Sequence, residues 1–219
     1  MSYATLNGQD VLEAHLNLPR VGVWHATLRV DSATLPTGLC TLEVGGMPYQ
    51  GTPRAAASFV VNDTAFVMLV GGAGRMREAV PPASYRNTPI SVPLKAAMDE
   101  VGEAVAAESD AAILGTQLRF WTRAAGPAGR AVSTLVAEAG AAWRMLPAGT
   151  LWVGAETWRP AAGEYELIEE SPLSRSVTVF SERPRLLPGT TLYGRPIAHV
   201  AHHVTEGALR TVVTFEDTL

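Results

Sequence analysis

Residues 24–30, Trp-His-Ala-Thr-Leu-Arg-Val, alternate between apolar and polar side chains. Because successive side chains of a strand point to opposite faces, the apolar residues from Trp24 to Val30 would share one face and the polar residues the other. A helix could not separate the two kinds of side chain in this pattern. The stretch therefore predicts a half-buried β-strand and gives the N-terminal part of the chain its β character.

Apolar runs on the C-terminal side of this stretch are separated by residues that favour turns. In chain order the runs are 40–44, 58–61 and 64–70, and the turn signals are Pro36-Thr37-Gly38, Gly45-Gly46 with Pro48, and Asn62-Asp63. Short strands with a turn signal about every 8 to 12 residues are typical of antiparallel barrels and sandwiches. We expect a small barrel or sandwich here.

A helical pattern begins after Pro89. Residues 94–107 place apolar side chains three and four positions apart, which predicts an amphipathic helix. Pro93 suits the first helical position, whereas Gly102 costs about 1 kcal/mol relative to alanine within a helix. The first long helix of the chain is therefore expected to follow the N-terminal β region.

Strand and helix patterns then alternate over a short segment. A strand is expected at 118–121, a helix at 131–143, and two strands at 143–146 and 150–154, joined through Pro147-Ala148-Gly149. Together they would form a compact α/β unit of about 40 residues, which is too small to bury a core alone. We expect this unit to pack against its neighbours.

The C-terminal part returns to β patterns. Strands are expected at 165–169, 175–180, 197–204 and 208–215. The last two flank Thr205-Glu206-Gly207, a turn of a length that closes an antiparallel hairpin. The sequence thus predicts a β, α/β, β order along the chain.

The composition limits the classes of function. The 219 residues are 47% hydrophobic and 17% charged, which excludes a disordered chain, and the net charge of −4 argues against a free-standing binder of DNA or of anionic membranes. The low charged fraction suits a surface that is covered by other subunits. Cys40, the sole cysteine, can form neither an internal disulfide nor a cysteine-based zinc site. Residues 1–10 lack the pattern of a signal peptide and no apolar run is long enough to span a membrane, so we expect a soluble protein without membrane insertion.

Three histidines near the C-terminus are the nearest approach to a metal site. On a strand His199 and His203 would face one side and His202 the other, so the three could not converge on one ion. Glu206 is the only local carboxylate that could complete a two-histidine site. A hairpin that carries partly exposed histidines is the favoured interpretation, with a metal site as the alternative.

Two further patterns are candidates for a phosphate-binding or a catalytic site. Gly71-Gly72-Ala73-Gly74-Arg75 is glycine-rich, but it lacks the lysine and hydroxyl of a phosphate-binding loop, so a tight bend is favoured. The carboxylate pairs Glu169-Glu170 and Glu216-Asp217 could serve acid/base chemistry on a glycan, yet adjacent strand residues face opposite sides. A solvated strand edge is the better explanation for both pairs.

The five tryptophans allow two interpretations. A stacked row could bind sugar or single-stranded nucleic acid, whereas burial in the core or at a subunit contact is the simpler expectation. We favour the second interpretation because Trp24 shares its predicted strand face with apolar residues. The tryptophans are Trp24, Trp121, Trp143, Trp152 and Trp158.

An ordered set of segments resembles a known family. The segments are 6–31 (LNGQDVLEAHLNLPRVGVWHATLRVD), 41–53 (TLEVGGMPYQGTP), 68–103 (MLVGGAGRMREAVPPASYRNTPISVPLKAAMDEVGE), 131–154 (AVSTLVAEAGAAWRMLPAGTLWVG) and 186–217 (LLPGTTLYGRPIAHVAHHVTEGALRTVVTFED). In this order they resemble the first barrel and following helix, the small α/β unit and the final barrel hairpin of phage tail baseplate hub proteins. The hub portion of type VI secretion spike proteins is built alike.

The resemblance implies a mainly β (α+β) fold with two small antiparallel barrels of tail-tube type. The implied division is an N-terminal β-barrel at 1–92, a connecting helix at 93–115, a small α/β unit at 116–156 and a C-terminal β-barrel region at 157–219. No catalytic, cofactor-binding or metal-ligating residue and no cofactor is expected. The chain is shorter than larger relatives of the family, which carry extra domains, so neither a lysozyme domain nor a spike domain fits within it.

In function, the resemblance implies a homotrimeric hub ring that leaves a channel for DNA in transit. Its partners would be the tail tube or distal tail protein, the central spike and other baseplate proteins. The expected location is the virion tail baseplate, reached from the host cytoplasm during assembly. The alternatives are another tail ring component, such as a distal tail or tube-like protein, and a cell-wall glycan hydrolase that uses Glu169 or Glu170.

Overall fold

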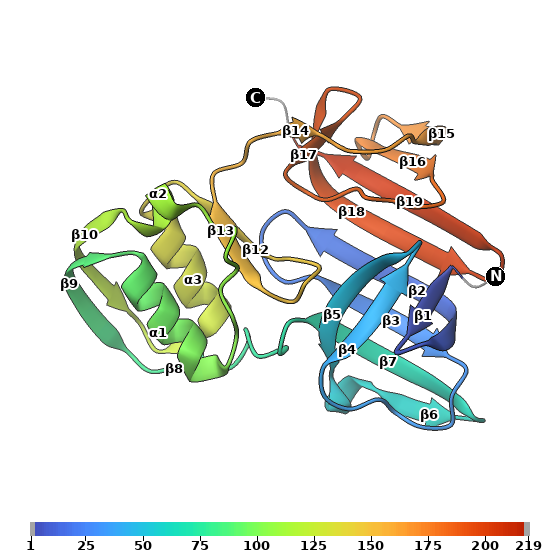
Figure 1. The fold of residues 1–219 in the computed structure, drawn as a ribbon, viewed down its shortest axis with the longest axis horizontal. Coiled ribbons are helices and arrows are strands. Elements are labelled where there is room, and N and C mark those ends of the chain that lie inside the picture. Colours follow the sequence, from blue (N-terminus) through green and yellow to red (C-terminus); the bar gives the residue numbers. More distant parts are fainter. Residues whose placement is uncertain (1–2, 217–219) are drawn as a thin grey trace.

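A computed structural model describes residues 3–216 and has a mainly β fold. Figure 1 shows two β regions stacked at one side of the molecule and a smaller unit that holds the helices at the other side. Thirteen strands belong to one hydrogen-bonded sheet system that joins the two β regions. The prediction of a mainly β fold is therefore confirmed, and one of the two predicted barrels is present as a closed ring. Within the described residues, no helix is long and apolar enough to cross a membrane.

The N-terminal region is a closed six-stranded antiparallel barrel. Its strands, in hydrogen-bonded order around the ring, are β1 (Ala4–Leu6), β4 (Cys40–Val44), β5 (Met47–Pro53), β7 (Thr64–Gly71), β3 (His25–Val30) and β2 (Gln9–Pro19), which pairs again with β1. Inward positions alternate with outward ones along β3, as the sequence pattern predicts. The short helix η1 (Ala55–Ala57) and strand β6 (Phe59–Val61) lie between β5 and β7, and Asn62-Asp63 forms the turn with positive φ at both residues.

Strand β2 connects the barrel to the C-terminal region. Its first residues pair with β1, whereas residues 14–19 pair with β18 (Arg195–Thr205), so one strand serves both regions. The sheet continues from β18 through β19 (Ala208–Phe215) and β16 (Ser176–Phe180) to β15 (Glu166–Ser171). The short strand β17 (Thr190–Leu192) pairs with the first residues of β18 and also with β14 (Arg159–Pro160). Among the described residues the hydrogen-bonded ring closes in the N-terminal region, whereas the C-terminal strands form an open sheet.

In the helical unit, α1 and α3 pack against each other and against short two-stranded antiparallel sheets. It comprises β8 (Ala79–Val80), β9 (Ala83–Pro89), α1 (Ser91–Val101), α2 (Ala111–Leu114), β10 (Gln117–Arg123), β11 (Gly126–Pro127), α3 (Ala128–Ala137), β12 (Ala142–Met145) and β13 (Leu151–Gly154). Buried Arg123 ties three of its parts together, because Nε donates to Pro81 O at 2.8 Å and Nη2 pairs with Glu100 at 2.7 Å. Strand β9, which precedes α1 in the sequence, pairs with β10, which follows it, so residues before and after α1 belong to the same unit. The four-part division of the chain stays a proposal.

Two helix boundaries differ from the predicted ones, and several strands, among them β2, β5 and β9, were not predicted. Helix α1 ends at Val101 rather than at 107, because Gly102 adopts a left-handed conformation with φ 68° and caps it. Helix α3 spans 128–137 rather than 131–143. Strand β2 was missed, although Val11, Ala14, Leu16 and Leu18 supply its buried face.

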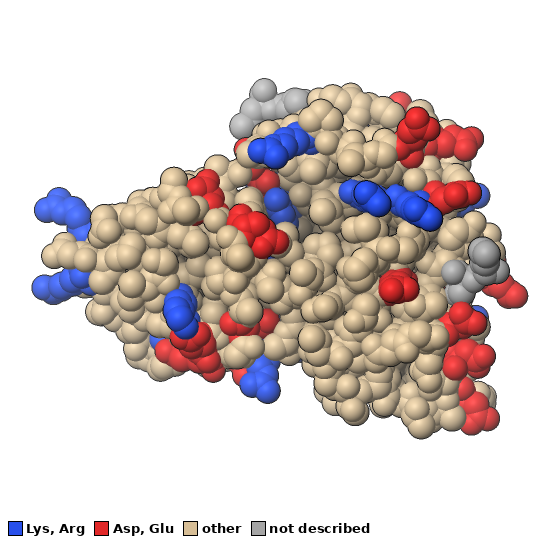
Figure 2. All heavy atoms as spheres, in the orientation of Figure 1, with Lys and Arg blue, Asp and Glu red and all other residues tan. Residues whose placement is uncertain are grey.

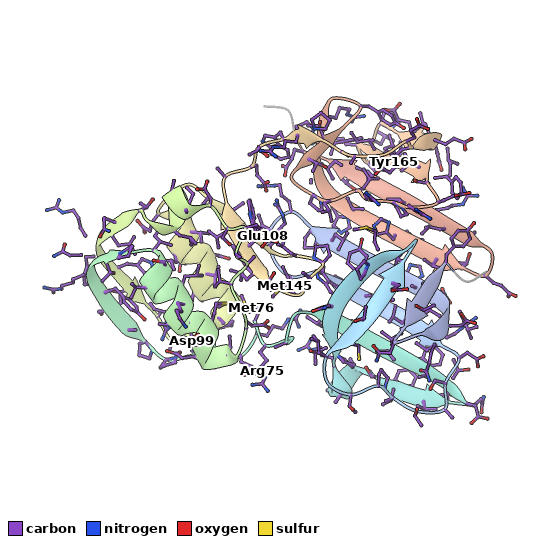
Figure 3. The ribbon with its side chains drawn as sticks, viewed as in Figure 1. Arg75, Met76, Asp99, Glu108, Met145 and Tyr165 are labelled. Atoms are coloured by element: carbon purple, nitrogen blue, oxygen red, sulfur yellow. The ribbon has the colours of Figure 1, made fainter. Side chains whose placement is uncertain are left out.

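The hairpin β12–β13 fixes the helical unit to the barrel. Gly22 donates its N–H to Trp143 O at 3.0 Å and accepts from Met145 N at 2.9 Å, and Gln50 N donates to Pro147 O at 2.7 Å. In Figure 3, Met145 lies with Arg75 and Met76 at this junction. The expectation that the α/β unit packs against its neighbours is therefore confirmed.

An ionic cluster joins the same hairpin to the end of β2 and to Glu216. Arg144 forms a two-point ion pair with Glu156, at 2.6 and 3.1 Å, and its guanidinium lies 4.1 Å from the centre of the Trp152 ring. Arg20 from the end of β2 contacts Glu156 at 3.8 Å and pairs with Glu216. Arg20 thus links the helical unit, through Glu156, to the C-terminal region, through Glu216.

Candidate functional site

The joined sheet has an open edge at each end. Among the described residues β6 is hydrogen-bonded only to β7, and β15 only to β16. Both edges expose apolar side chains, since Phe59 and Val61 of β6 are 54% and 48% exposed, and Leu167 and Ile168 of β15 are 49% and 44% exposed. Open strand edges with apolar side chains are templates for pairing with another chain.

The two open edges run in opposite directions. From one edge to the other the strands are β6, β7, β3, β2, β18, β19, β16 and β15, and every neighbouring pair is antiparallel. With eight strands in alternating direction, the last strand runs opposite to the first. A second copy that is related by rotation can therefore add its β15 to β6 as another antiparallel pair.

The sheet also presents one continuous outer face. Directly paired residues form a row across seven strands on this face: Glu169, Thr178, Val212, Ala201, Asn17, His25 and Val70. The neighbouring residues in β3, Ala26 and Leu28, are buried on the barrel side. Residues of the barrel and of the C-terminal region thus share one surface.

All five histidines of the sequence lie on the three adjacent strands β2, β3 and β18. His202 is fully buried, whereas His199 and His203 are partly exposed on the outer face, as the strand alternation predicts. His15 and His203 are directly paired, with their Nδ1 atoms 2.8 Å apart, and His15 Nε2 lies 3.2 Å from Glu13. Within residues 3–216 no group of three or more histidine, cysteine, aspartate or glutamate side chains is arranged to hold a metal ion.

Burial lowers the pKa of four of these histidines. For His203 and His199, the neighbouring rings of His15 and His25 lower the pKa further, and for His25 the nearby Arg77 acts in the same direction. Burial, with a smaller effect of His203, lowers the pKa of His202 to about 3. Its Nδ1 lies 2.8 Å from the Thr211 hydroxyl, so the ring is a neutral core group.

The glycine-rich stretch binds a carboxylate of its own chain. Ala73 N and Arg75 N each donate to Glu103, both at 2.9 Å, and a Cβ on Gly72 would come within 2.5 Å of the same carboxylate. Burial raises the pKa of the Glu103 carboxyl, against the lowering effect of the two N–H groups. The predicted tight bend is confirmed, and its anion-binding N–H groups are used internally.

Replacing Glu103 with glutamine should destabilise the protein by about 1 kcal/mol, because the amide offers one acceptor oxygen where the carboxylate offers two. Amide hydrogen exchange should accelerate at residues 73 and 75 more than elsewhere. NMR-detected exchange together with urea unfolding measures both effects. Glu108→Gln, at an exposed carboxylate, is the matched control. Unchanged exchange at both amides would show that Glu103 does not hold the bend.

The carboxylate pair Glu169-Glu170 does not form a two-carboxylate site. Glu169 lies opposite Thr178 and Glu170 opposite Val177, so they face opposite sides of β15, and Glu170 pairs with Arg195 at 3.1 Å. Glu216 pairs with Arg20, and Asp217 lies outside the described residues. Glu206 lies in the turn between β18 and β19.

The tryptophans serve packing and do not form a row. Trp24, Trp121 and Trp143 are buried, and Trp143 Nε1 donates to Ser133 at 2.9 Å. Trp152 lies under Arg144, and Trp158 is half-buried after β13. The expectation of core positions is confirmed for the three buried rings.

Charged side chains are sparse on the visible surface. Figure 2 shows acidic side chains along the side formed by the barrel and the C-terminal sheet, with basic ones among them over the C-terminal strands, and further basic ones at the opposite tip, over β9 and β10. Most of this face carries neither charge.

Comparisons with known proteins identify the fold. No family model and no curated protein matches the chain. Among solved structures, the 43 kDa tail protein of prophage MuSo2 from Shewanella oneidensis aligns with a TM-score of 0.69 and 8% identity, over 97% of this chain and 96% of that one. A tail protein from Neisseria meningitidis aligns with a TM-score of 0.69 and 10% identity, over 99% and 96% of the two chains.

A third similar structure comes from a secretion system. It is an Escherichia coli component of the type VI secretion system, described as similar to the bacteriophage T4 tail proteins gp27 and gp5. It aligns with a TM-score of 0.66 and 10% identity, over 98% of this chain and 77% of that one. The chain therefore has the fold of phage tail proteins, and the predicted resemblance to the baseplate hub family is confirmed at the level of the fold.

Proposed function

We propose that this chain is a non-enzymatic structural subunit of a phage tail baseplate hub. Three copies form a ring that joins the tail tube to the central spike and leaves a channel through which DNA passes. The likeness to tail proteins over nearly the whole chain supports a structural role in a tail and a place in the virion. The tube or distal tail protein, the spike and other baseplate proteins are the proposed partners, and assembly takes place in the host cytoplasm.

The open, oppositely directed edges β6 and β15 carry the proposal of a ring. A head-to-tail contact closes into a ring when the rotation between copies returns to the start, and it needs two different surfaces on each copy. The edges of one sheet supply both surfaces, and strand addition supplies main-chain hydrogen bonds. The exposed side chains of Val61 and Ile168 add apolar area that pairing would bury.

A second tail role has one observation in its favour. The hydrogen-bonded ring closes in the N-terminal region of the described chain, and a single closed barrel is what a tube-like or distal tail ring subunit would need. Such a subunit would also form rings through its sheet edges. Binding to a spike protein separates the two roles, because only a hub joins the spike.

The mass of the protein in solution tests the ring. We expect about 70 kDa, three times the 23.2 kDa of one chain, by light scattering after size exclusion. Val61→Lys and Ile168→Lys should each produce the monomer mass, because a charge on an edge strand opposes pairing. Leu173→Lys is the matched control, since Leu173 is fully exposed in the turn after β15. A wild-type protein that stays monomeric at high concentration would contradict the proposal.

A further inference from the structure

An unpaired basic group borders the β6 edge. Arg54 follows β5, and its N–H donates to Met68 O at 2.8 Å, which places it next to β7 on the same side as β6. A cavity of about 300 Å³ opens there, with Met68, Val70 and Met76 in its wall and His25, Arg54 and Arg77 around them. Neither Arg54 nor Arg77 has an ion-pair partner within residues 3–216. This end of the sheet therefore carries positive charge that the chain itself does not neutralise.

An unpaired acidic group borders the opposite edge. Glu166 and Glu169 of β15 lie opposite Phe180 and Thr178, whereas Leu167 and Glu170 lie opposite buried Val179 and Val177. The two carboxylates are thus on the outer face, and among the described residues neither forms an ion pair. Glu170 faces the other side and is already paired with Arg195.

The two charged groups share one face of the sheet. The row of paired residues from Glu169 to His25 and Val70 runs across the outer face from the acidic edge to the wall of the cavity. When sheets join edge to edge, side chains that share a face become cross-strand neighbours, and opposite charges then stabilise the contact. The acidic residues Glu166 and Glu169 of one copy would meet the basic residues Arg54 and Arg77 of the next copy.

We propose that Glu166 and Glu169 on the outer face of β15 dock beside Arg54 and Arg77 of a neighbouring copy and select the head-to-tail order of the ring. This inference rests on the proposed ring and adds the charged groups that specify it. The contact excludes pairing between two β15 edges, which would bring four carboxylates together. It also predicts that the ring weakens as salt rises, because exposed charge pairs are screened.

Charge reversal tests the inference. Arg54→Glu and Glu169→Arg should each weaken trimer formation by about three- to tenfold at low salt, measured by analytical ultracentrifugation over a concentration series. The double variant, which restores opposite charges, should recover most of the loss. Arg119→Glu, an exposed arginine on β10, has the same change of charge and should leave the trimer unchanged.

The outcomes separate this inference from the ring itself. The charged contact is wrong, while the ring stands, if each single reversal leaves the trimer as stable as in the wild type. The same holds if the trimer of the double variant is no more stable than that of the less stable single variant. A wild-type chain that is a monomer would remove the ring and this inference together. Circular dichroism of each variant shows whether a loss of trimer comes from unfolding.

Discussion

Replacing Trp24 with alanine should lower the free energy of unfolding by about 4 kcal/mol, the range in which buried tryptophans and phenylalanines fall. The side chain is 1% exposed and packs edge-on against Tyr49 of β5. Its indole Nε1 donates to Leu146 O at 3.1 Å, so the same residue holds the helical unit. Urea unfolding of the wild type and the variant measures the difference.

The walls around Trp24 explain why the loss would be large. A Cβ added to Gly51 or Gly71 would lie 2.7 or 2.6 Å from the indole, so both glycines leave the room that the ring fills. Main chain forms these walls and cannot collapse into the cavity that alanine would leave. Trp24→Phe should cost less, because it keeps an aromatic ring and loses only the hydrogen bond and part of the volume. Leu173→Ala, at a fully exposed side chain, should change stability by less than about 0.5 kcal/mol. A loss of less than about 1 kcal/mol in the free energy of unfolding for Trp24→Ala would show that the indole does not hold the barrel and the helical unit together.

The elements that could be predicted from sequence are those in which the local pattern and the final environment agree. Strand β3 alternates because one side faces the barrel core and the other faces solvent, so its residues report their own surroundings. The hairpin β12–β13 was predicted almost residue for residue, since Pro147 and Gly149 mark its turn. Local signals of this kind need no knowledge of the partner strands.

The features that were missed depend on contacts distant in sequence. Strand β2 alternates cleanly only from Ala14 to Leu18, and a register shift between Val11 and Glu13 interrupts the pattern before that, so the strand could not be recognised in full from its own residues. Nothing near Ala73 in sequence indicates that Glu103, 30 residues later, accepts the hydrogen bond of its N–H group. The open edges are also a property of the whole sheet, although the apolar Phe59-Val60-Val61 beside a turn is a signal that could have been used.

Acidification from pH 7.5 to pH 5 should lower the free energy of unfolding by about 2 kcal/mol through His202 alone. Its pKa is about 3 in the folded protein and 6.5 in the unfolded chain, so the unfolded state binds more protons over this range and stability falls with pH. The loss begins near pH 6.5 and continues until pH 3, where the folded protein also takes up the proton. Chemical unfolding at half-unit pH steps measures the slope.

The His202→Asn variant identifies the source of this slope. Asparagine does not titrate and can keep a hydrogen bond with the Thr211 hydroxyl, so the variant should be less stable at pH 7.5 and should lose most of the pH dependence. The surroundings of His202 do not stabilise a positive charge on its ring. The centre of the Tyr49 ring is 6.5 Å from the centre of the His202 ring, and burial raises the pKa of Tyr49, so that hydroxyl stays neutral. The Nε2 atom of His202 has no hydrogen-bond partner within the described residues. Glu103 acts with the opposite sign, since a carboxyl whose pKa is raised by burial favours the folded state as pH falls. Because β18 joins the barrel to the C-terminal sheet, a proton forced onto His202 would strain the strand pairing on which both halves depend. A His202→Asn variant that keeps the full slope would assign the acid sensitivity to the outer-face histidines instead.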